Sequence, residues 1–267
     1  QAKIIAKLEK PMAIQHLWEI IDLADGVMVA RGDLGVEMAP EDVPSIQKRI
    51  IRKCREAGKP VIVATQMLDS MISSPSPTRA EASDVATAIY DGVDAVMLSA
   101  ESASGKYPIE AVSMMDRIIT RVEQDGIYEQ MLEAARPLPL ARVADAITTA
   151  ARHVANTIDI AAIVTFTDSG ATTLRAARER PDVPIIAATP NLITARRLAL
   201  VWGVHAVLTP EIYKFSEMVN KGCQIAFEQK FARQGDMIIM IAGVPFAVSG
   251  GTNILRIATI ETFSEES

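Results

Sequence analysis

The sequence contains only two cysteines and three histidines among its 267 residues. Cys54 and Cys223 lie on separate helical patterns without the spacing of metal ligands, so we expect both to pack as reduced thiols, as in a cytoplasmic protein. His16, His153 and His205 have no partner at a recognisable spacing, and we interpret each as a packing or surface residue. The sequence therefore predicts no metal site built from cysteine or histidine.

An excess of positive charge and a long apolar run are also missing. The chain has 27 Lys and Arg against 33 Asp and Glu, a net charge of −6 and a pI of about 5.2. No broad basic surface is available for nucleic acid, and an anionic substrate must be held by local cations or metal ions. The longest apolar run, residues 237–248, is interrupted by Gly243 and Pro245 and is too short to span a bilayer, and no signal-peptide pattern opens the chain. We therefore expect a cytoplasmic protein that binds neither nucleic acid nor membranes.

Four apolar runs near the start of the chain each end in polar side chains. The runs span residues 4–9, 27–33, 61–66 and 95–101. Short runs of Val, Ile, Leu and Met are typical of buried parallel strands, and in a (β/α) barrel the reactive groups lie where those strands end. We expect the following polar groups to surround one mouth: Lys7, Glu9, Asp33, Thr65, Ser99 and Glu101.

The segments between these runs have helical patterns. They span residues 13–24, 45–57 and 78–90, and the last begins with a capping box formed by Thr78 and Glu81. The predicted fold class is α/β, with residues 1–136 forming half of a (β/α)8 TIM-type barrel, because four βα units make half of eight. A half-barrel exposes two sheet edges and an uncovered inner face, so we expect a fragment, or residues before Gln1 that complete the fold.

A second domain is expected in residues 137–267, because Pro137-Leu138-Pro139 follows a helical segment at 109–135. Helices are predicted at 143–156, 172–180, 192–201 and 215–232, and strands at 161–166, 184–188, 206–208, 237–242 and 254–259. This alternation predicts a three-layer α/β domain with a mostly parallel five-stranded sheet. The last two strands are joined too closely for a helical crossover, so the final strand should be antiparallel.

The residue types at the predicted strand ends suit a phosphate and a divalent metal. Lys7 and Glu9 are two apart on one strand and therefore face the same side of the sheet. Glu9 and Asp33 can ligate Mg²⁺, which takes one or two carboxylates and leaves positions for substrate oxygens. Lys7 can offset charge on a phosphoryl group in transit, and Thr65 adds a hydroxyl. The Gly32–Asp33 amides, expected in a turn, suit a carboxylate.

The same residues have structural interpretations. Lys7 and Glu9 can form an ion pair at a barrel end, Asp33 alone is typical of a turn, and Thr65 alone is typical of a strand. Function is favoured because four strand ends in succession carry compatible groups.

Five segments resemble pyruvate kinase, and the similarity extends over nearly the whole chain. They are residues 5–9 (IAKLE), 28–35 (MVARGDLG), 58–68 (GKPVIVATQML), 77–81 (PTRAE) and 91–99 (DGVDAVMLS). The resemblance implies a glycolytic, allosteric transferase that is a homotetramer at full length. It implies phosphoryl transfer from phosphoenolpyruvate to ADP, giving pyruvate and ATP, with Mg²⁺ or Mn²⁺ and K⁺ as cofactors.

The resemblance also implies roles for individual residues. Lys7 would stabilise the phosphoryl group, while Glu9 and Asp33 would hold the divalent ion. Thr65 would lie near the substrate carboxylate and the enolate carbon that gains a proton, and Gly32 would contact the carboxylate through its backbone. The family's first four barrel strands, lid domain, substrate arginine and K⁺ ligands have no counterpart here, so we expect these residues alone to have negligible activity.

The second domain resembles the regulatory domain of the same family. The candidate effector-binding residues are Thr167, Ser169, Gly170, Thr172, Ser249, Gly250, Gly251 and Thr252. Hydroxyls and free amides at a helix start form an anion site, although an N-cap followed by an ordinary glycine turn has the same pattern. Asp168 and Ala171 stand where many fructose-bisphosphate-regulated relatives have basic residues, which favours a sugar monophosphate or nucleotide monophosphate.

Two other functions remain open. A metal-dependent lyase acting on pyruvate-like enolates also uses carboxylates at barrel strand ends, but it needs neither Lys7 beside Glu9 nor a second α/β domain. A regulatory or oligomerisation fragment would use exposed helices, for example a two-fold interface around residues 78–90.

Overall fold

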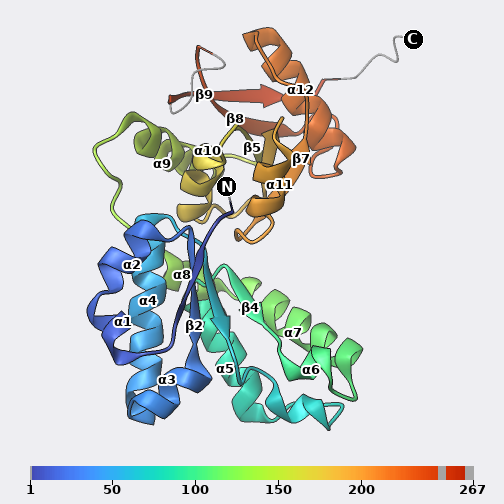
Figure 1. Ribbon diagram of the computed structural model, residues 1–267. Coiled ribbons are helices and arrows are strands. Elements are labelled where there is room, and N and C mark those ends of the chain that lie inside the picture. The colour runs from blue at the N-terminus through green and yellow to red at the C-terminus, as the bar shows by residue number, and fades with distance from the viewer. Residues whose placement is uncertain (1, 246–250, 262–267) are drawn as a thin grey trace. The chain divides into compact units, whose positions relative to one another are not determined.

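The structure is a computed structural model and describes residues 2–245 and 251–261. The chain forms two compact units, Gln1–Arg136 and Pro137–Ser267 (Figure 1). Both alternate strands and helices, as the apolar runs and the helical stripes between them predict.

The first unit is built on a four-stranded parallel sheet in the order β1-β2-β3-β4. Its strands are β1 (Ile5–Leu8), β2 (Gly26–Ala30), β3 (Val61–Ala64) and β4 (Ala95–Met97). Ala30 pairs with Ala64, which pairs with Met97, so the carboxyl ends of these strands lie at one edge. The predicted half-barrel order is confirmed.

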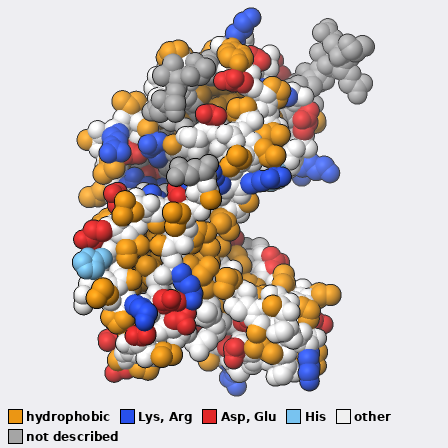
Figure 2. All heavy atoms as spheres, viewed as in Figure 1, with side chains coloured by type: hydrophobic (Ala, Val, Ile, Leu, Met, Phe, Trp, Pro, Cys, Tyr) orange, Lys and Arg blue, Asp and Glu red, His pale blue; other side chains and the backbone are white. Residues whose placement is uncertain are grey.

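Helices pack on one face of this sheet. Val27 and Val29 of β2 and Val61 and Val63 of β3 are fully buried in the core, which the apolar stripe of α4 helps to close. The opposite face carries Ile5, which is 43% exposed at the sheet edge. On the face viewed in Figure 2, apolar side chains gather over the strands of this unit. Successive side chains along each strand point to opposite faces of the sheet, so one face is covered by helices and the other is partly uncovered.

Most helices of the first unit follow the predicted segments with two breaks, whereas α3 and α6 form where no helix was predicted. They are α1 (Pro11–Gln15), α2 (Leu17–Leu23), α3 (Arg31–Glu37), α4 (Val43–Ala57), α5 (Arg79–Tyr90), α6 (Ala100–Ala103), α7 (Pro108–Glu123) and α8 (Gly126–Ala134), with 3-10 turns η1 (Pro40–Asp42) and η2 (Asp69–Ile72). The segment predicted at 13–24 breaks at His16. The segment predicted at 109–135 breaks at Asp125, because this side chain accepts a hydrogen bond from the Ile127 amide at 3.0 Å and starts a new helix.

The capping box predicted at residues 78–81 is confirmed. The Glu81 amide donates to Thr78 Oγ1 at 3.2 Å, and the Thr78 amide donates to Glu81 Oε2 at 2.7 Å. Burial alone would raise the pKa of Glu81, but hydrogen bonds from Ser70 and Thr78 lower it overall. The charged carboxylate thus fixes the start of α5 against the preceding turn.

The second unit has a five-stranded sheet in the order β7-β6-β5-β8-β9. Its strands are β5 (Ile160–Phe166), β6 (Ile185–Thr189), β7 (Val204–Leu208), β8 (Met237–Gly243) and β9 (Thr252–Thr259), and its helices are α9 (Val143–Ala155), α10 (Ala171–Arg178), α11 (Leu192–Leu198) and α12 (Phe215–Glu228). β8 and β9 pair antiparallel, whereas the other neighbours are parallel, as predicted.

Two separate cores show that this unit has three layers. Met218 and Cys223 of α12 pack with Val164 on one side of the sheet. Ala176 of α10 and Leu198 of α11 lie in a second cluster on the other side. Cys223 is a buried free thiol here, as Cys54 is in the first unit, so the packing role predicted for both cysteines is confirmed.

Candidate functional site: an ammonium between two carboxylates

Three strand ends of the first unit carry the predicted site residues. Lys7 lies in β1, Glu9 follows that strand, and Thr65 directly follows β3. Asp33 comes after β2, but it lies in the first turn of α3, so the expectation of a Gly32–Asp33 loop turn is wrong. The helix begins at Arg31 directly after the strand, which brings Asp33 back toward β1.

The side chain of Lys7 lies between the two acidic residues. Its Nζ is 2.6 Å from Glu9 Oε2 and 2.8 Å from Asp33 Oδ2, and all three side chains are exposed to solvent. The hydrogen bonds that Lys7 donates, first to Asp33 and second to Glu9, raise its pKa above the usual 10.5. The hydrogen bond from Lys7 lowers the pKa of Asp33 below its usual 3.8. At neutral pH the cluster therefore holds one ammonium, with an ionised Asp33 beside it.

The donor set at this position fits a divalent cation. Two carboxylate oxygens from separate elements bind one positive group, so they already converge on a single point. Mg²⁺ typically takes one or two protein carboxylates and fills its other positions with water or substrate oxygens. Within residues 2–245 and 251–261, no cluster of three or more His, Cys, Asp or Glu side chains suits a metal, so a metal at this site depends on such additional oxygens.

Thr65 lies in an unusual backbone bend beside this cluster. Thr65 has φ 71° and the next residue, Gln66, has φ 56°, both in the left-handed region that non-glycine residues rarely adopt. Thr65 Oγ1 accepts a hydrogen bond from the Gly32 amide at 2.7 Å and donates to the Ala64 carbonyl at 2.5 Å. The Gly32 amide is thus engaged within the chain, and its contact with a substrate carboxylate stays a prediction.

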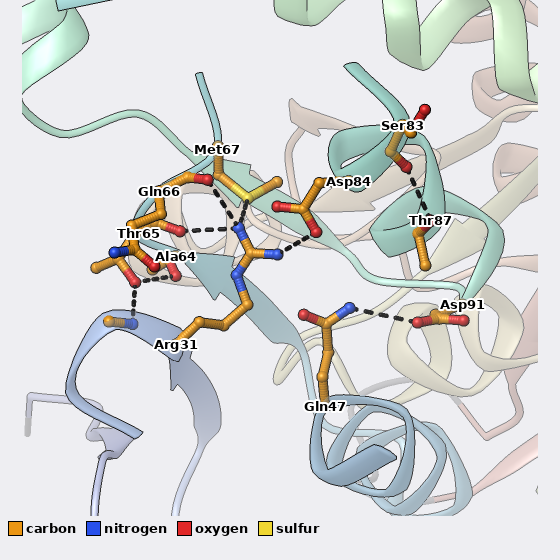
Figure 3. A network of polar contacts seen from close by, with 11 residues as sticks. Arg31, Gln47, Ala64, Thr65, Gln66, Met67, Ser83, Asp84, Thr87 and Asp91 are labelled. Carbon is orange, nitrogen blue, oxygen red and sulfur yellow. Dashed lines mark hydrogen bonds and ion pairs between the residues drawn. The ribbon is translucent and has the colours of Figure 1, made fainter. Parts of the chain in front are cut away.

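Arg31 is a residue of this region to which the sequence pattern assigned no function. Its side chain is almost fully buried, and its guanidinium reaches the Thr65 and Gln66 carbonyls, the Met67 sulfur and the Asp84 carboxylate (Figure 3). A charged residue directly after a buried strand is the only signal in the sequence. Its partners could not be identified there, because they come from residues 65–67 and from α5.

The predicted position of Glu101 at the mouth is wrong. Glu101 is only 2% exposed, and its carboxylate accepts hydrogen bonds from the Leu68 amide at 3.2 Å and the Ser99 amide at 2.7 Å. The side chain therefore connects backbone segments in the interior. Ser99 remains exposed at the end of β4.

A pocket in the second unit brings together most of the candidate effector residues. It has a volume of about 180 Å³, and five of the predicted residues line it: Thr167, Ser169, Thr172, Gly251 and Thr252. Gly170 adjoins the pocket at the start of α10, with φ 89°. The hydroxyls of Thr172 and Thr252 are 2.7 Å apart, so α10 and β9 meet there. Ser249 and Gly250 lie outside the described residues.

The position of this pocket in the sheet is typical of ligand sites. Its lining includes Phe166, Ala188 and Gly243, which lie at or near the carboxyl ends of β5, β6 and β8. In this sheet β6 lies on one side of β5 and β8 lies on the other, so the strand order changes direction at β5. Ligands bind preferentially at such topological switch points. Arg175 also lines the pocket, and the sequence pattern did not single it out.

Comparisons with known proteins agree with the geometry of both units. The family model described as pyruvate kinase, barrel domain, matches residues 1–112, and the model described as pyruvate kinase, alpha/beta domain, matches residues 145–258. The chain belongs to the pyruvate kinase family. This membership weakens the case for a lyase that merely shares carboxylates at barrel strand ends.

Individual relatives show how much of a pyruvate kinase is present. The chain is 52% identical over 260 residues to a pyruvate kinase of Methylorubrum extorquens, covering 97% of the chain and 54% of that relative. It is 48% identical to a pyruvate kinase of Geobacillus stearothermophilus, covering 97% and 44%. The crystal structure of a pyruvate kinase from Cryptosporidium parvum superposes with a TM-score of 0.87 at 37% identity, covering 97% and 51%. The chain thus spans about half the length of the relatives it matches.

Among the described residues, no helix is both long enough and apolar enough to cross a membrane.

Proposed function

We propose that this chain supplies the second half of the active-site barrel and the regulatory domain of a pyruvate kinase. The reaction transfers the phosphoryl group of phosphoenolpyruvate to a terminal oxygen of ADP. The bridging P–O bond breaks with its electrons left on the enolate, and the enolate carbon then gains a proton to give pyruvate. The observation that supports this most is the Lys7 ammonium held by Glu9 and Asp33 at the carboxyl edge of a parallel sheet.

In this proposal Lys7 and the two carboxylates have separate roles. Glu9 and Asp33 would hold Mg²⁺ or Mn²⁺, which supplies positive charge that polarises the substrate oxygens. Lys7 offsets the negative charge of the phosphoryl group during transfer, and its raised pKa keeps it protonated at neutral pH. A fixed ammonium is effective there because catalysis of phosphoryl transfer depends mainly on positioning and charge.

The bend after β3 would serve the second step of the reaction. The Thr65 hydroxyl is held within hydrogen-bond distance of Gly32 and Ala64, at the same sheet edge as the ammonium. We propose that it faces the substrate carboxylate and the enolate carbon. The K⁺ ligands are expected outside these 267 residues. We propose a cytoplasmic location, since both cysteines are free thiols. We also propose that the complete enzyme is a homotetramer, as the resemblance to pyruvate kinase implies.

A chimeric enzyme tests this function. The chain would replace the matching 54% of the Methylorubrum extorquens relative, so that the relative supplies the remaining half. We expect the chimera to convert phosphoenolpyruvate and ADP in the presence of Mg²⁺ and K⁺, and the 267-residue polypeptide alone to show negligible turnover under the same conditions. Inactivity of a folded chimera would contradict the proposed function, and full-length rates from the polypeptide alone would contradict the requirement for a second half.

We further propose that the pocket in the second unit binds a sugar monophosphate or nucleotide monophosphate. Thr167, Ser169, Thr172 and Arg175 line it, and the Arg175 guanidinium also lies 3.5 Å from the carboxylate of Asp145. The carboxylates of Asp168 and Glu211 are also part of the lining, which disfavours a second phosphate by charge repulsion.

Calorimetric titration of the chain with AMP, a pentose 5-phosphate, a hexose 6-phosphate and a hexose bisphosphate tests this pocket. We expect a monophosphate to bind more tightly than the bisphosphate, and Arg175→Gln to weaken binding about tenfold, because a charge-assisted hydrogen bond is lost. Arg196→Gln is the matched control, since Arg196 is exposed on α11 and does not line the pocket. Absence of heat with every ligand would show that the pocket is only structural.

A further inference from the structure

The backbone bend at Thr65 and Gln66 is the strongest conformational outlier near the candidate site. Only four non-glycine residues in the described part of the chain have positive φ, and Thr65 and Gln66 are the two that are consecutive. A β-branched residue such as Thr65 at φ 71° is strained, and such strain persists only where the surroundings hold it. The question is which group holds this bend.

Arg31 makes the contacts that hold it. Its Nη2 donates to the Thr65 carbonyl at 2.8 Å and to the Gln66 carbonyl at 3.3 Å, so one nitrogen binds both residues of the bend. The same nitrogen lies 2.8 Å from the Met67 sulfur, which continues the contact along the chain. The left-handed backbone orients both carbonyl groups toward the same nitrogen of Arg31. The guanidinium is therefore complementary to this conformation of the backbone.

A second contact fixes the guanidinium itself. Arg31 Nη1 donates to Asp84 Oδ1 of α5 at 2.6 Å, and Arg31 is only 8% exposed (Figure 3). The planar fork of an arginine can bind α5 and the bend at once, whereas a lysine offers a single donor group. Arg31 also lies one residue before Gly32, whose amide binds the Thr65 hydroxyl. The arginine therefore links β2, the bend and α5.

We propose that Arg31 is a positioning residue that holds Thr65 and Gln66 in the left-handed conformation and so orients the Thr65 hydroxyl for the enolate step. The proposal rests on the proposed function, because it assigns Thr65 to that step. The hydrogen bonds of the Arg31 guanidinium go to the bend, to Met67 and to α5. They do not go to the proposed metal ligands or to Lys7.

The test uses the chimeric enzyme with Arg31→Lys, with and without Gln66→Gly. Misplacing a reacting group by about 1 Å costs up to about 100-fold in rate, so we expect Arg31→Lys to lower kcat by about 10- to 100-fold and leave the KM for ADP within about twofold. Glycine adopts positive φ without strain. Because the side chain of Gln66 is exposed, Gln66→Gly in the Arg31→Lys background should restore kcat at least about threefold.

Two further variants separate positioning from general stability. Arg55→Lys changes another buried arginine of the first unit, in α4, and should leave kcat unchanged. Asp84→Asn keeps an acceptor for Arg31 but removes its charge. We expect a smaller loss of kcat than for Arg31→Lys, and this variant also serves if Arg31→Lys does not fold.

The outcomes decide the proposal. Unchanged kcat in Arg31→Lys, or a loss that Gln66→Gly does not reduce, would overturn it. An inactive unsubstituted chimera would instead overturn the proposed function. The bend is then judged from crystals of the Arg31→Lys chain: loss of the left-handed φ at Thr65 or Gln66 supports the holding role of Arg31, and retention of both values overturns it.

Discussion

Lys7→Met is expected to lower kcat of the chimeric enzyme by about 1,000-fold. Methionine keeps an unbranched side chain of similar length but removes the charge that offsets the phosphoryl group, and loss of one such electrostatic contact costs about 100- to 1,000-fold. The effect should be similar between about pH 6 and 9, because Asp33 and Glu9 raise the pKa of Lys7 and the ammonium stays charged throughout. Steady-state kinetics at several pH values measure it.

Lys10→Met is the matched control for this change. Lys10 is a nearby exposed lysine that pairs with Glu37 at 3.3 Å and does not contact the acidic pair that binds Lys7. We expect its kcat to stay within about twofold of the unsubstituted chimera, as for other exposed ion pairs. A loss of less than about tenfold in Lys7→Met, or equal losses in both variants, would show that Lys7 is a structural ion-pair residue.

Asp33→Asn is expected to raise the Mg²⁺ concentration required for half-maximal activity by about 10- to 100-fold. The substitution keeps an oxygen at this position but removes one of the two carboxylate charges that converge on the proposed ion site. It also removes the negative charge of Asp33, which contributes to the raised pKa of Lys7. Initial rates against free Mg²⁺, and Mn²⁺ binding followed by electron paramagnetic resonance, measure the change.

Glu37→Gln provides the control for the acidic residue. Glu37 lies on the same helix as Asp33, is similarly exposed and pairs with Lys10, so its loss alters the charge of α3 without touching the proposed ligands. Its Mg²⁺ requirement should stay within about twofold. Equal Mg²⁺ requirements in Asp33→Asn and the unsubstituted chimera would contradict a metal site at Glu9 and Asp33.

The strands and most helices could be predicted from local patterns. Fully buried β3 is a continuous apolar run, and α4 has an apolar stripe of helical period, so each element carries its own signal. The antiparallel last strand followed from the short connection to β8. Lys7 and Glu9 could be placed together because residues two apart in an extended strand share a face.

Other features could not be predicted because they depend on contacts between distant residues. Glu101 is polar and follows a strand, like Lys7 and Asp33, yet it is buried because amides at positions 68 and 99 surround it. The sequence gives no sign of the left-handed φ of Thr65, or of the hydrogen bond that the Thr65 carbonyl accepts from Arg31, 34 residues away along the chain. Arg175 lines the pocket in the second unit only because of how its helix packs there.

The order of strands and helices, the half-barrel with its second α/β unit, and the types of charged groups at the strand ends were all encoded in short stretches of sequence. Local hydrophobic period and chain connectivity are sufficient to specify them. The tertiary structure decided which of those polar groups converge and which are buried. The separation of the ammonium–carboxylate cluster from the interior Glu101, and the conformation of Thr65 against Arg31, result from packing between segments about 30 to 50 residues apart along the chain.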